Sequence, residues 1–338
     1  MASAQDEPER PGRATIRDVA SRAGVSIATV SRVLSDKQHI RPEVRERVRE
    51  AVAELGYRPN RVARQLRSRR SATLGLIVSD IRNPFFASVS RVVEDVASAH
   101  DYNVFLCNAD EDPEKERRYL QVLNAQQVEG IVLSPTNETA QTLAEVAPPG
   151  IPLVVIDREV PAGGVDQIGI DNERAAHELC STLFERGATR VAAVFGNASS
   201  TGIARHAGFL AAHRDRDLEP DPELSAFDRP TTEKGYEQTK RYLARTDRPD
   251  ALFASNGTVA AGVARAIHEA GLKIGQDILL GCFDRPEWID LLQLPVIAVE
   301  QPTAEIGKVA FELLKARIDE PGRATERLQL RHALSQPD

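Results

Sequence analysis

The spacing of hydrophobic residues changes along the chain, and it predicts short helices first and alternating strands and helices afterwards. In the stretch "TIRDVASRA" apolar residues recur every three or four positions, which is typical of one face of a helix. Thr15 can cap this helix, and Asp18, three residues later, fits a variant of the capping box. Gly24 is expected to end it, because glycine leaves a helix without steric cost. The chain therefore opens with a capped helix and a tight turn.

A second short helix is predicted for "SIATVSRVL", capped by Ser26. Its residues Val30, Val33 and Leu34 fall on one face and pack inward. The outward face then carries Ile27, Ala28, Thr29, Ser31 and Arg32. Two helices joined by a tight turn form a helix-turn-helix, whose second helix can enter the major groove of DNA. A third amphipathic helix, beginning near Pro42, completes a small domain, although other three-helix domains share this pattern.

The basic stretch "GYRPNRVARQLRSRRS" follows the third helix. Asn60 can cap a short helix there, which would bring Val62, Ala63 and Leu66 together. Its arginines, of which Arg61 is the first, can lie along DNA phosphates. A helix of this length is not stable alone, so we expect it to form only with a partner and to act as a switch.

From residue 72 onward, apolar strands such as "TLGLIVSD", "YNVFLCNAD" and "GIPLVVID" alternate with amphipathic helices. Strands separated by helices of this length form parallel sheets with helices on both faces. The alternation forms two blocks, 72–171 and 173–300, and "AVEQPTAEIGKVAFELLKARI" then returns to the first. The fold class expected is an all-α helix-turn-helix headpiece plus an α/β core of two doubly wound parallel lobes.

Ligands of such sheets bind outside the carboxyl ends of the strands, which here would face a cleft between the lobes. The residues that follow the strands are mostly hydrogen-bond acceptors, joined by two aromatic residues: Asp80, Asn83, Phe85, Phe86, Asp110, Asp157, Asn256 and Asp284. This set suits a sugar or another polyol. The carboxylates can alternatively cap helices, and the two phenylalanines can belong to the core.

Charge is distributed unevenly over the 338 residues, whose formal net charge is -7. Residues 1–70 hold 16 Lys and Arg against 9 Asp and Glu, whereas residues 71–338 hold 27 against 41. A basic head on an acidic body indicates a polyanionic partner for the head alone.

Several classes of function are disfavoured by the motifs that the sequence lacks. No apolar run is long enough to cross a membrane, and the first twelve residues lack the apolar core of a signal peptide, so a cytoplasmic protein is expected. The three cysteines have no C-x-x-C spacing and predict no metal site. No nucleophile elbow, phosphate-binding loop or dinucleotide-binding glycine motif is present. We therefore expect no catalytic residues, no cofactor and no enzymatic activity.

The stretch "TIRDVASRAGVSIATVSRVL", followed by "GYRPNRVARQL", closely resembles the headpiece and hinge helix of the LacI/GalR family of transcriptional regulators. The first residues of the chain, which have no apolar core, are expected to form a disordered tail. The resemblance implies that a headpiece, a hinge helix with linker, and a core for effector binding and dimerisation follow this tail. These parts would span residues 1–12, 13–58, 59–71 and 72–338. The core resembles periplasmic sugar-binding proteins, with one lobe of residues 72–171 and 301–330 and another of residues 172–300 and 331–338.

In this family the second helix reads the major groove, which implies that Ile27, Ala28 and Arg32 face base edges. The resemblance places these residues near phosphates: Thr15, Ser26, Thr29, Ser31 and Asn60. The hinge helices of two subunits enter the minor groove, where Leu66 would wedge between the central base pairs. Arg32 can bond guanine through two hydrogen bonds, whereas Ile27 and Ala28 offer only apolar contacts, which leaves the operator sequence open.

The effector contacts of the family correspond here to Asp80, Asn83, Phe85, Asp157, Arg205, Asn256, Asp284 and Gln301. Arg205 matches the arginine that usually grips the effector, and a structural salt bridge is the alternative. Trp288 can stack on the apolar face of a ligand or belong to the core. Gly257 stands where many relatives have an aspartate, which would ease binding of an anionic ligand or make room for a bulkier one.

The function expected is therefore that of a repressor that binds a palindromic operator as a homodimer. A small carbohydrate effector (a sugar, sugar acid or sugar phosphate) in the cleft would switch its affinity for DNA. A sugar-sensing activator and an effector-independent DNA-binding protein are the alternatives. A free sugar-binding protein would need neither the basic head nor its helices.

Overall fold

The computed structural model of the chain describes residues 14–34, 40–57, 71–161, 164–196 and 199–336. The chain divides into two compact units, Met1–Arg70 and Ser71–Asp338. The predicted hinge helix, with Asn60, Arg61, Val62, Ala63 and Leu66, lies outside the described residues. The predicted tail of residues 1–12 lies outside them as well.

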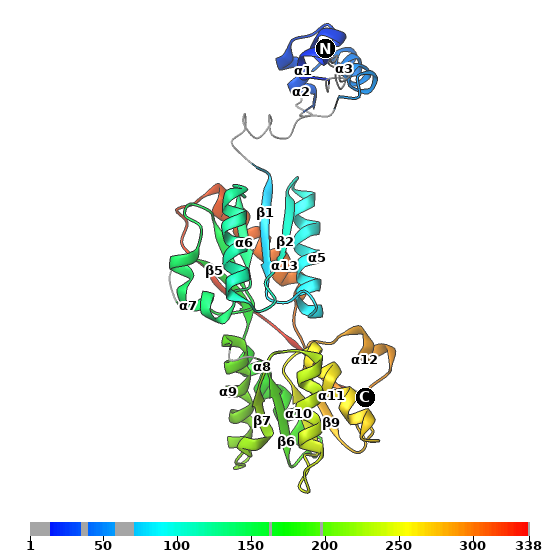
Figure 1. The fold of residues 1–338 in the computed structure, drawn as a ribbon, viewed down its shortest axis with the longest axis vertical. Helices are drawn as coiled ribbons and strands as arrows, with labels where there is room; N and C mark the ends of the chain where they lie inside the picture. Colours follow the sequence, from blue (N-terminus) through cyan, green and yellow to red (C-terminus); the bar gives the residue numbers. More distant parts are fainter. Residues whose placement is uncertain (1–13, 35–39, 58–70, 162–163, 197–198, 337–338) are drawn as a thin grey trace, which may run out of the picture. The chain divides into compact units, whose positions relative to one another are not determined.

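Three helices form the described part of the first unit: α1 (Ile16–Ala23), α2 (Ile27–Leu34) and α3 (Pro42–Glu54) (Figure 1). At the start of α1, Thr15 Oγ1 accepts a hydrogen bond from the amide of Asp18 at 3.4 Å, and the Asp18 carboxylate accepts one from the amide of Thr15 at 2.7 Å. Gly24 ends α1 with a left-handed φ of 65°. The predicted capping box and glycine turn are thus confirmed. A small core that includes Val19 and Val30 holds the helices together.

The first lobe of the second unit contains a fully parallel sheet of order β11-β5-β4-β3-β1-β2. Its strands are β1 (Thr73–Val78), β2 (Asn103–Asn108), β3 (Gly130–Leu133), β4 (Leu153–Ile156), β5 (Asp166–Ile170) and β11 (Arg327–Leu330). One face packs against α5 (Pro84–Ala99) and α13 (Thr303–Asp319), and the other packs against α6 (Pro113–Ala125) and α7 (Asn137–Val146). Because helices cover both faces, β1, β3 and β4 are apolar and buried along their whole length.

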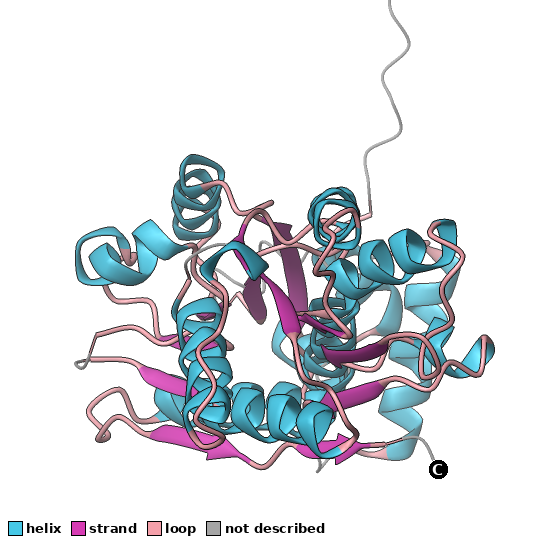
Figure 2. Cartoon of the chain, turned by 90° about the horizontal axis from the view of Figure 1, so that it is seen from below, coloured by secondary structure: helices cyan, strands magenta, loops and turns pink. Residues whose placement is uncertain are grey.

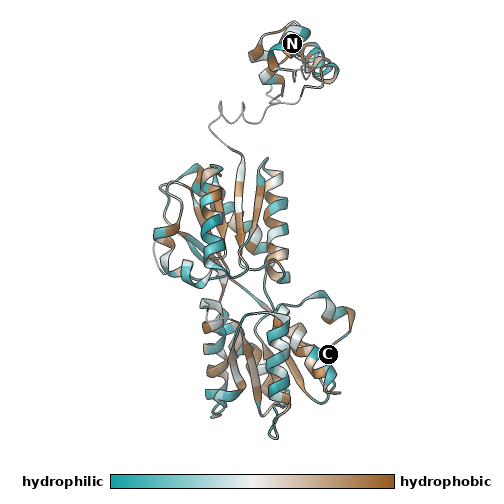
Figure 3. Ribbon diagram, viewed as in Figure 1, coloured by the Kyte–Doolittle hydropathy of each residue, from teal (hydrophilic) through white to brown (hydrophobic). Residues whose placement is uncertain are grey.

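The second lobe repeats this arrangement with the order β12-β10-β9-β8-β6-β7, in which only the β10–β12 pair is antiparallel. Its strands are β6 (Val191–Phe195), β7 (Ser225–Phe227), β8 (Ala251–Ala254), β9 (Leu279–Phe283), β10 (Ile297–Glu300) and β12 (Ala333–Ser335). Helices α8 (Asn172–Glu185) and α9 (Ser200–Arg214) cover one face, and α10 (Thr232–Leu243) and α11 (Gly257–Glu269) cover the other. Figure 2 shows the helices of the molecule in cyan and the strands in magenta. The predicted doubly wound α/β architecture is confirmed. Figure 3 shows its largely hydrophobic strands and its amphipathic helices.

The helices of the second lobe approach one another closely in two pairs. A Cβ atom on Gly208 of α9 would lie 2.0 Å from the carbonyl oxygen of Glu173 on α8. A Cβ atom on Gly262 of α11 would lie 1.9 Å from the carbonyl oxygen of Thr232 on α10. Both positions therefore require glycine, because any side chain would push the paired helices apart.

The chain crosses between the lobes three times: from β5 to α8, from β10 to α13 and from β11 to β12 (Figure 1). The first sheet takes its strands from residues 72–171 and 301–330, and the second takes its strands from residues 172–300 and 331–338. Because all strands of the first sheet and all but β12 of the second run parallel, each lobe presents several carboxyl ends at one edge.

Among the described residues, no helix combines the length and the apolar character needed to span a membrane. Within the same ranges, no cluster of three or more His, Cys, Asp and Glu side chains is placed to hold a metal ion.

Candidate functional site: the face of α2 and the interlobe cleft

The outward face of α2 is small, polar and basic. Ala28 and Arg32 are exposed, and Thr29 and Ser31 are half-buried. Arg32 lies in the last turn of the helix. A short helix with small side chains and one long cation on its free face fits the width of a DNA major groove.

Two of the residues predicted to contact DNA also hold the helix in place. Ser26 Oγ accepts a hydrogen bond from the amide of Thr29 at 3.1 Å, so it caps α2 as predicted. Ile27 differs from the prediction: it is partly buried and packs against the core of the headpiece. Its position in the first turn turns part of the side chain inward, which leaves Ala28 and Arg32 as the most accessible predicted base contacts.

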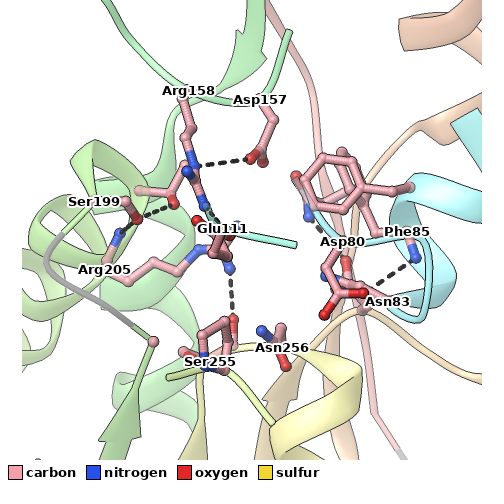
Figure 4. A pocket seen from close by; sticks show the side chains of 17 residues that line it. Asp80, Asn83, Phe85, Glu111, Asp157, Arg158, Ser199, Arg205, Ser255 and Asn256 are labelled. Carbon is pink, nitrogen blue, oxygen red and sulfur yellow. Dashed lines mark hydrogen bonds and ion pairs between the residues drawn. The ribbon is translucent and has the colours of Figure 1, made fainter. Parts of the chain in front are cut away.

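A cavity of about 50 Å³ lies between the lobes, at the carboxyl ends of their strands (Figure 4). Eight of the nine predicted effector residues line it: Asp80, Asn83, Phe85, Asp157, Arg205, Asn256, Asp284 and Gln301. The residues that sequence reasoning missed include Glu111, Arg158, Ser199, Thr201 and Ser255. The cavity is therefore surrounded by carboxylates, amides and hydroxyls, and each lobe contributes one arginine to its wall.

The wall from the first lobe begins at the end of β1. The Asp80 carboxylate accepts hydrogen bonds from Nε and Nη2 of Arg82 at 2.9 and 2.7 Å. Asn83 Oδ1 caps α5 by accepting a hydrogen bond from the amide of Phe85 at 3.1 Å. The rings of Phe85 and Phe86 pack edge to face at 5.0 Å, and both belong to the core while they line the cleft. A residue can therefore cap a helix, as Asn83 does, or belong to the core, as the two phenylalanines do, and still line the cleft.

Asp157 follows β4 with a left-handed φ of 66° and stands beside Arg158. Arg158 forms a buried ion pair with Glu111 and donates a hydrogen bond to the carbonyl of Pro135 at 2.7 Å. Its buried Nε makes no hydrogen bond within the described residues and lies 3.9 Å from Asp157 Oδ2. The Arg158 head is therefore fixed, and among the described residues no group donates a hydrogen bond to the Asp157 carboxylate.

Arg205, on α9, supplies the positive charge that the second lobe contributes to the wall of the cavity. Its Nε donates to Asn172 Oδ1 at 2.8 Å, and its Nη1 donates to the carbonyl of Ser255. The guanidinium carbon lies 3.9 Å from the centroid of the Phe283 ring, a cation–π contact. Burial lowers the pKa of Arg205, and the charges of Asp157 and Asp284 oppose this shift.

Asp284 ends β9 as Asp157 ends β4, again with a left-handed φ, here of 67°. Gln301 Nε2 donates a hydrogen bond to Asp284 Oδ1 at 2.8 Å, and burial raises the pKa of Asp284. Asn256 Oδ1 caps α11 by accepting a hydrogen bond from the amide of Val259 at 2.8 Å. The Ser255 hydroxyl is buried and has no hydrogen-bond partner within the described residues, although it borders the cavity.

Burial raises the pKa of Asp157 to about 6, against the attraction of Arg158 and Arg205. Between about pH 4 and pH 6, the Asp157 carboxyl is therefore protonated in the folded protein but ionised in the unfolded chain. The contribution of Asp157 to the free energy of unfolding falls as pH rises through that window. Because asparagine cannot ionise and accepts a left-handed backbone, Asp157→Asn should be more stable than the parent near pH 8, by up to about 3 kcal/mol. The advantage should disappear at about pH 4. Urea unfolding at both pH values measures it, and an advantage that does not vary with pH would contradict the assignment.

Trp288 does not line the cleft, so the predicted stacking on a ligand there is not supported. Pro286 begins the short helix α12 (Glu287–Leu291), and Trp288 on this helix packs against the core of the second lobe. It lines a different, apolar cavity of about 600 Å³ beside α11. The position of Trp288 therefore agrees with the other role that the sequence left open, that of a core residue.

The structure adds a packing reason for Gly257 to the two alternatives that the sequence left open. A Cβ atom at this position would lie 3.3 Å from the ring of Pro286, which is a tight contact. The backbone of Gly257 also lowers the pKa of Asp284, against the larger effect of burial.

Comparisons with known proteins agree with both halves of this picture. The family described as bacterial regulatory proteins, lacI family, matches residues 15–60, and periplasmic binding proteins and sugar binding domain of LacI family matches residues 71–337. The ribose operon repressor of Halalkalibacterium halodurans is 35% identical over 317 residues, which cover 94% of each chain.

Two solved structures share the complete architecture. The lac repressor dimer bound to operator and the anti-inducer ONPF has 25% identity and a TM-score of 0.84 over 96% of this chain and 98% of its own. The complex of the transcriptional regulator CelR with cellobiose has 27% identity and a TM-score of 0.71 over 96% and 98%. The relatives are transcriptional regulators and not enzymes, as expected. The chain therefore belongs to the lacI family of bacterial regulatory proteins.

Proposed function

We propose that the protein is a repressor whose affinity for an operator is switched by a small carbohydrate bound in the interlobe cleft. The observation that carries this proposal is the cleft itself: Asp157 and Asp284 face it from opposite lobes, with Arg205 beside them. Carboxylates and amides accept hydrogen bonds from hydroxyl groups, and phenylalanine rings cover the apolar faces of sugars. The cellobiose complex of a related regulator supports the same class of ligand.

A second part of the proposal is that the protein acts as a homodimer on a palindromic operator. Large apolar side chains are exposed on β2, where Phe105 and Leu106 are 47% and 49% exposed, and at the end of α12, where Leu291 and Leu292 are 81% and 61% exposed. Such residues are suited to burial against a second copy. The related lac repressor binds its operator as a dimer. A headpiece alone offers a small interface, and pairing two of them supplies useful specificity.

Effector binding must favour one arrangement of the lobes over the other, because equal affinity for both would leave DNA binding unchanged. We infer that closure of the cleft changes the mutual orientation of the two first lobes in the dimer. That change would alter how the headpieces are presented to the two half-sites.

The experiment that tests this function starts from duplexes selected out of a random palindromic pool by the full chain. Affinity for the selected duplex is then measured as a function of salt, with and without D-ribose, cellobiose, gluconate and fructose 1-phosphate. Specific, salt-dependent binding that one of these probes changes at least tenfold, together with a raised melting temperature, is the expected result. Specific binding that none of a wider set of sugars changes would favour the effector-independent alternative. Stimulation of transcription from the selected site would favour the activator.

Arg32→Ala should relax the choice of operator sequence. Loss of a two-point contact with guanine costs about 1–3 kcal/mol at one base pair, and the preference for that base should fall with it. Arg49→Ala, which removes an exposed arginine from α3, is the matched control and should leave the sequence preference unchanged. Equal weakening on every sequence would show that Arg32 only contacts phosphate.

A further inference from the structure

Among the described residues, two hydrogen bonds join the lobes at separate points beside the cleft, in addition to the Gln301–Asp284 bond at the crossing segment. Arg229 Nη2, from the loop after β7 in the second lobe, donates to the carbonyl oxygen of Asp110 in the first lobe at 3.3 Å. The amide of Glu159, in the first lobe, donates to Ser200 Oγ at the start of α9 at 2.9 Å. Neither Arg229 nor Ser200 lines the cavity.

The acceptor for Arg229 is held in a rigid loop. Asp110 and Glu111 both have left-handed φ values, 55° and 56°. Asp110 Oδ1 accepts a hydrogen bond from Asn108 Nδ2 at 2.8 Å, and its second oxygen pairs with Lys115. This conformation lets Glu111 line the cavity while the Asp110 carbonyl bonds to the opposite lobe.

The donor loop is organised as well. The amide of Arg229 donates to Asp228 Oδ1 at 2.8 Å, and the amide of Thr231 donates to the carbonyl of Arg229 at 2.7 Å. Pro230, between them, lines the cavity. The Arg229 side chain is exposed. Among the described residues, its hydrogen bond to the carbonyl of Asp110 is the one hydrogen bond that it makes to the other lobe.

The second hydrogen bond has the same relation to the cavity. Ser200 follows Ser199, which caps α9 and lines the cavity, and Glu159 follows Arg158, which also lines it. Each interlobe hydrogen bond therefore lies one residue away from the cavity wall on both sides. Both bonds span the two lobes beside the cavity wall, so separation of the lobes at these points would break them.

We propose that Arg229 and Ser200 form an interlobe latch that sets how far the cleft is closed, and hence how tightly it holds its ligand, without touching that ligand. The regulatory consequence rests on the proposed carbohydrate-switched function, whereas the effect on the lobes does not. When only the closed arrangement holds ligand tightly, the apparent affinity scales with the fraction of molecules that are closed. A single weak hydrogen bond shifts such an equilibrium about twofold to tenfold.

The test measures lobe separation directly in the full chain without any ligand. Gln121→Cys on α6 and Lys240→Cys on α10 place one exposed thiol on each lobe for spin labels, and the three native cysteines are buried. Dilution of the labelled chain with excess unlabelled chain restricts the distance measurement to one subunit. The mean distance should lengthen in Arg229→Ala and in Ser200→Ala, and should lengthen most when both are combined.

Arg241→Ala is the matched control, because this arginine on α10 bonds to Gln238 within its own helix. It should leave the distance unchanged. An unchanged distance in both latch variants would overturn the proposal.

Titration with D-ribose, cellobiose, gluconate and fructose 1-phosphate gives the second readout. A probe that binds the parent should bind each single variant about twofold to tenfold more weakly. Weaker binding without a change in distance would mean that Arg229 contacts the ligand, and would also overturn the latch. If no probe binds the parent, the carbohydrate proposal fails, but the distances still decide whether the latch exists.

Discussion

Arg205→Ala should abolish the response of DNA binding to effector while operator binding itself persists. The substitution removes the cation that stands beside Asp157 and Asp284 and leaves Asn172 Oδ1 and the Ser255 carbonyl without their donor. A lost hydrogen bond from a charged group costs about 1.5–3 kcal/mol, which corresponds to a tenfold to hundredfold loss of effector affinity. Titration of the operator complex with an effector found in the ligand panel measures the response.

The control for Arg205 is Arg216→Ala. Arg216 also packs over a phenylalanine, with its guanidinium carbon 5.1 Å from the ring centroid of Phe184, but it does not line the cleft. Its removal should leave the effector response intact. Circular dichroism and melting of both variants establish that they are folded. A normal effector response in folded Arg205→Ala would restrict Arg205 to the structural salt-bridge role that the sequence left open.

Asp166→Ala should strongly reduce the stability of the first lobe. Asp166 is fully buried at the start of β5, and its carboxylate accepts hydrogen bonds from Arg317 Nε and Nη2 at 2.8 and 3.0 Å. The amide of Glu326, just before β11, donates to the same carboxylate at 2.8 Å. Arg317 also donates to the carbonyls of Arg323 and Ala324, at 2.8 and 3.0 Å. One carboxylate thus ties together β5, α13 and the approach to β11.

Removing one partner of a buried ion pair leaves an uncompensated charge and costs about 3–5 kcal/mol. Asp95→Ala is the control, because Asp95 pairs with Arg91 at 3.0 Å on the exposed surface of α5 and its loss should cost at most about 1 kcal/mol. Urea unfolding of the two variants gives both values. Equal costs would mean that the Asp166 pair does not hold the first lobe together.

Most of the fold followed from local patterns. The apolar runs of β1, β2 and β4 and the amphipathic stretches of α5 and α6 were recognisable because strand and helix repeats differ strongly. The strand β5 and the helices α9 and α10 were not identified individually. In β5 a buried aspartate and glutamine interrupt the apolar run, and α9 is nearly as apolar on one side as on the other, so neither carries a clear repeat.

The cleft was predictable where residues directly follow strands. Asp157 and Asp284 directly follow a strand and Asp80 lies two residues beyond one, and parallel topology brings such positions together without knowledge of side-chain contacts. Glu111 and Arg158 lie next to predicted positions, and their place depends on left-handed backbone at Asp110, Glu111 and Asp157, which no local repeat reveals.

The position of Trp288 could not be inferred in the same way. It lies close in sequence to Asp284, but it belongs to α12, whose packing places the ring against the core and in a separate apolar cavity lined by α11.

The three crossings between the lobes have a consequence for how such proteins diversify. Neither lobe is encoded by one continuous stretch of the gene, so recombination can exchange a whole lobe only with several simultaneous breakpoints. The described headpiece helices, by contrast, lie in residues 14–57, ahead of every strand of the core, and one breakpoint separates them from it. A new operator preference can thus be joined to an existing pocket in a single genetic event. Changes of ligand must accumulate by point substitution within an inherited cleft.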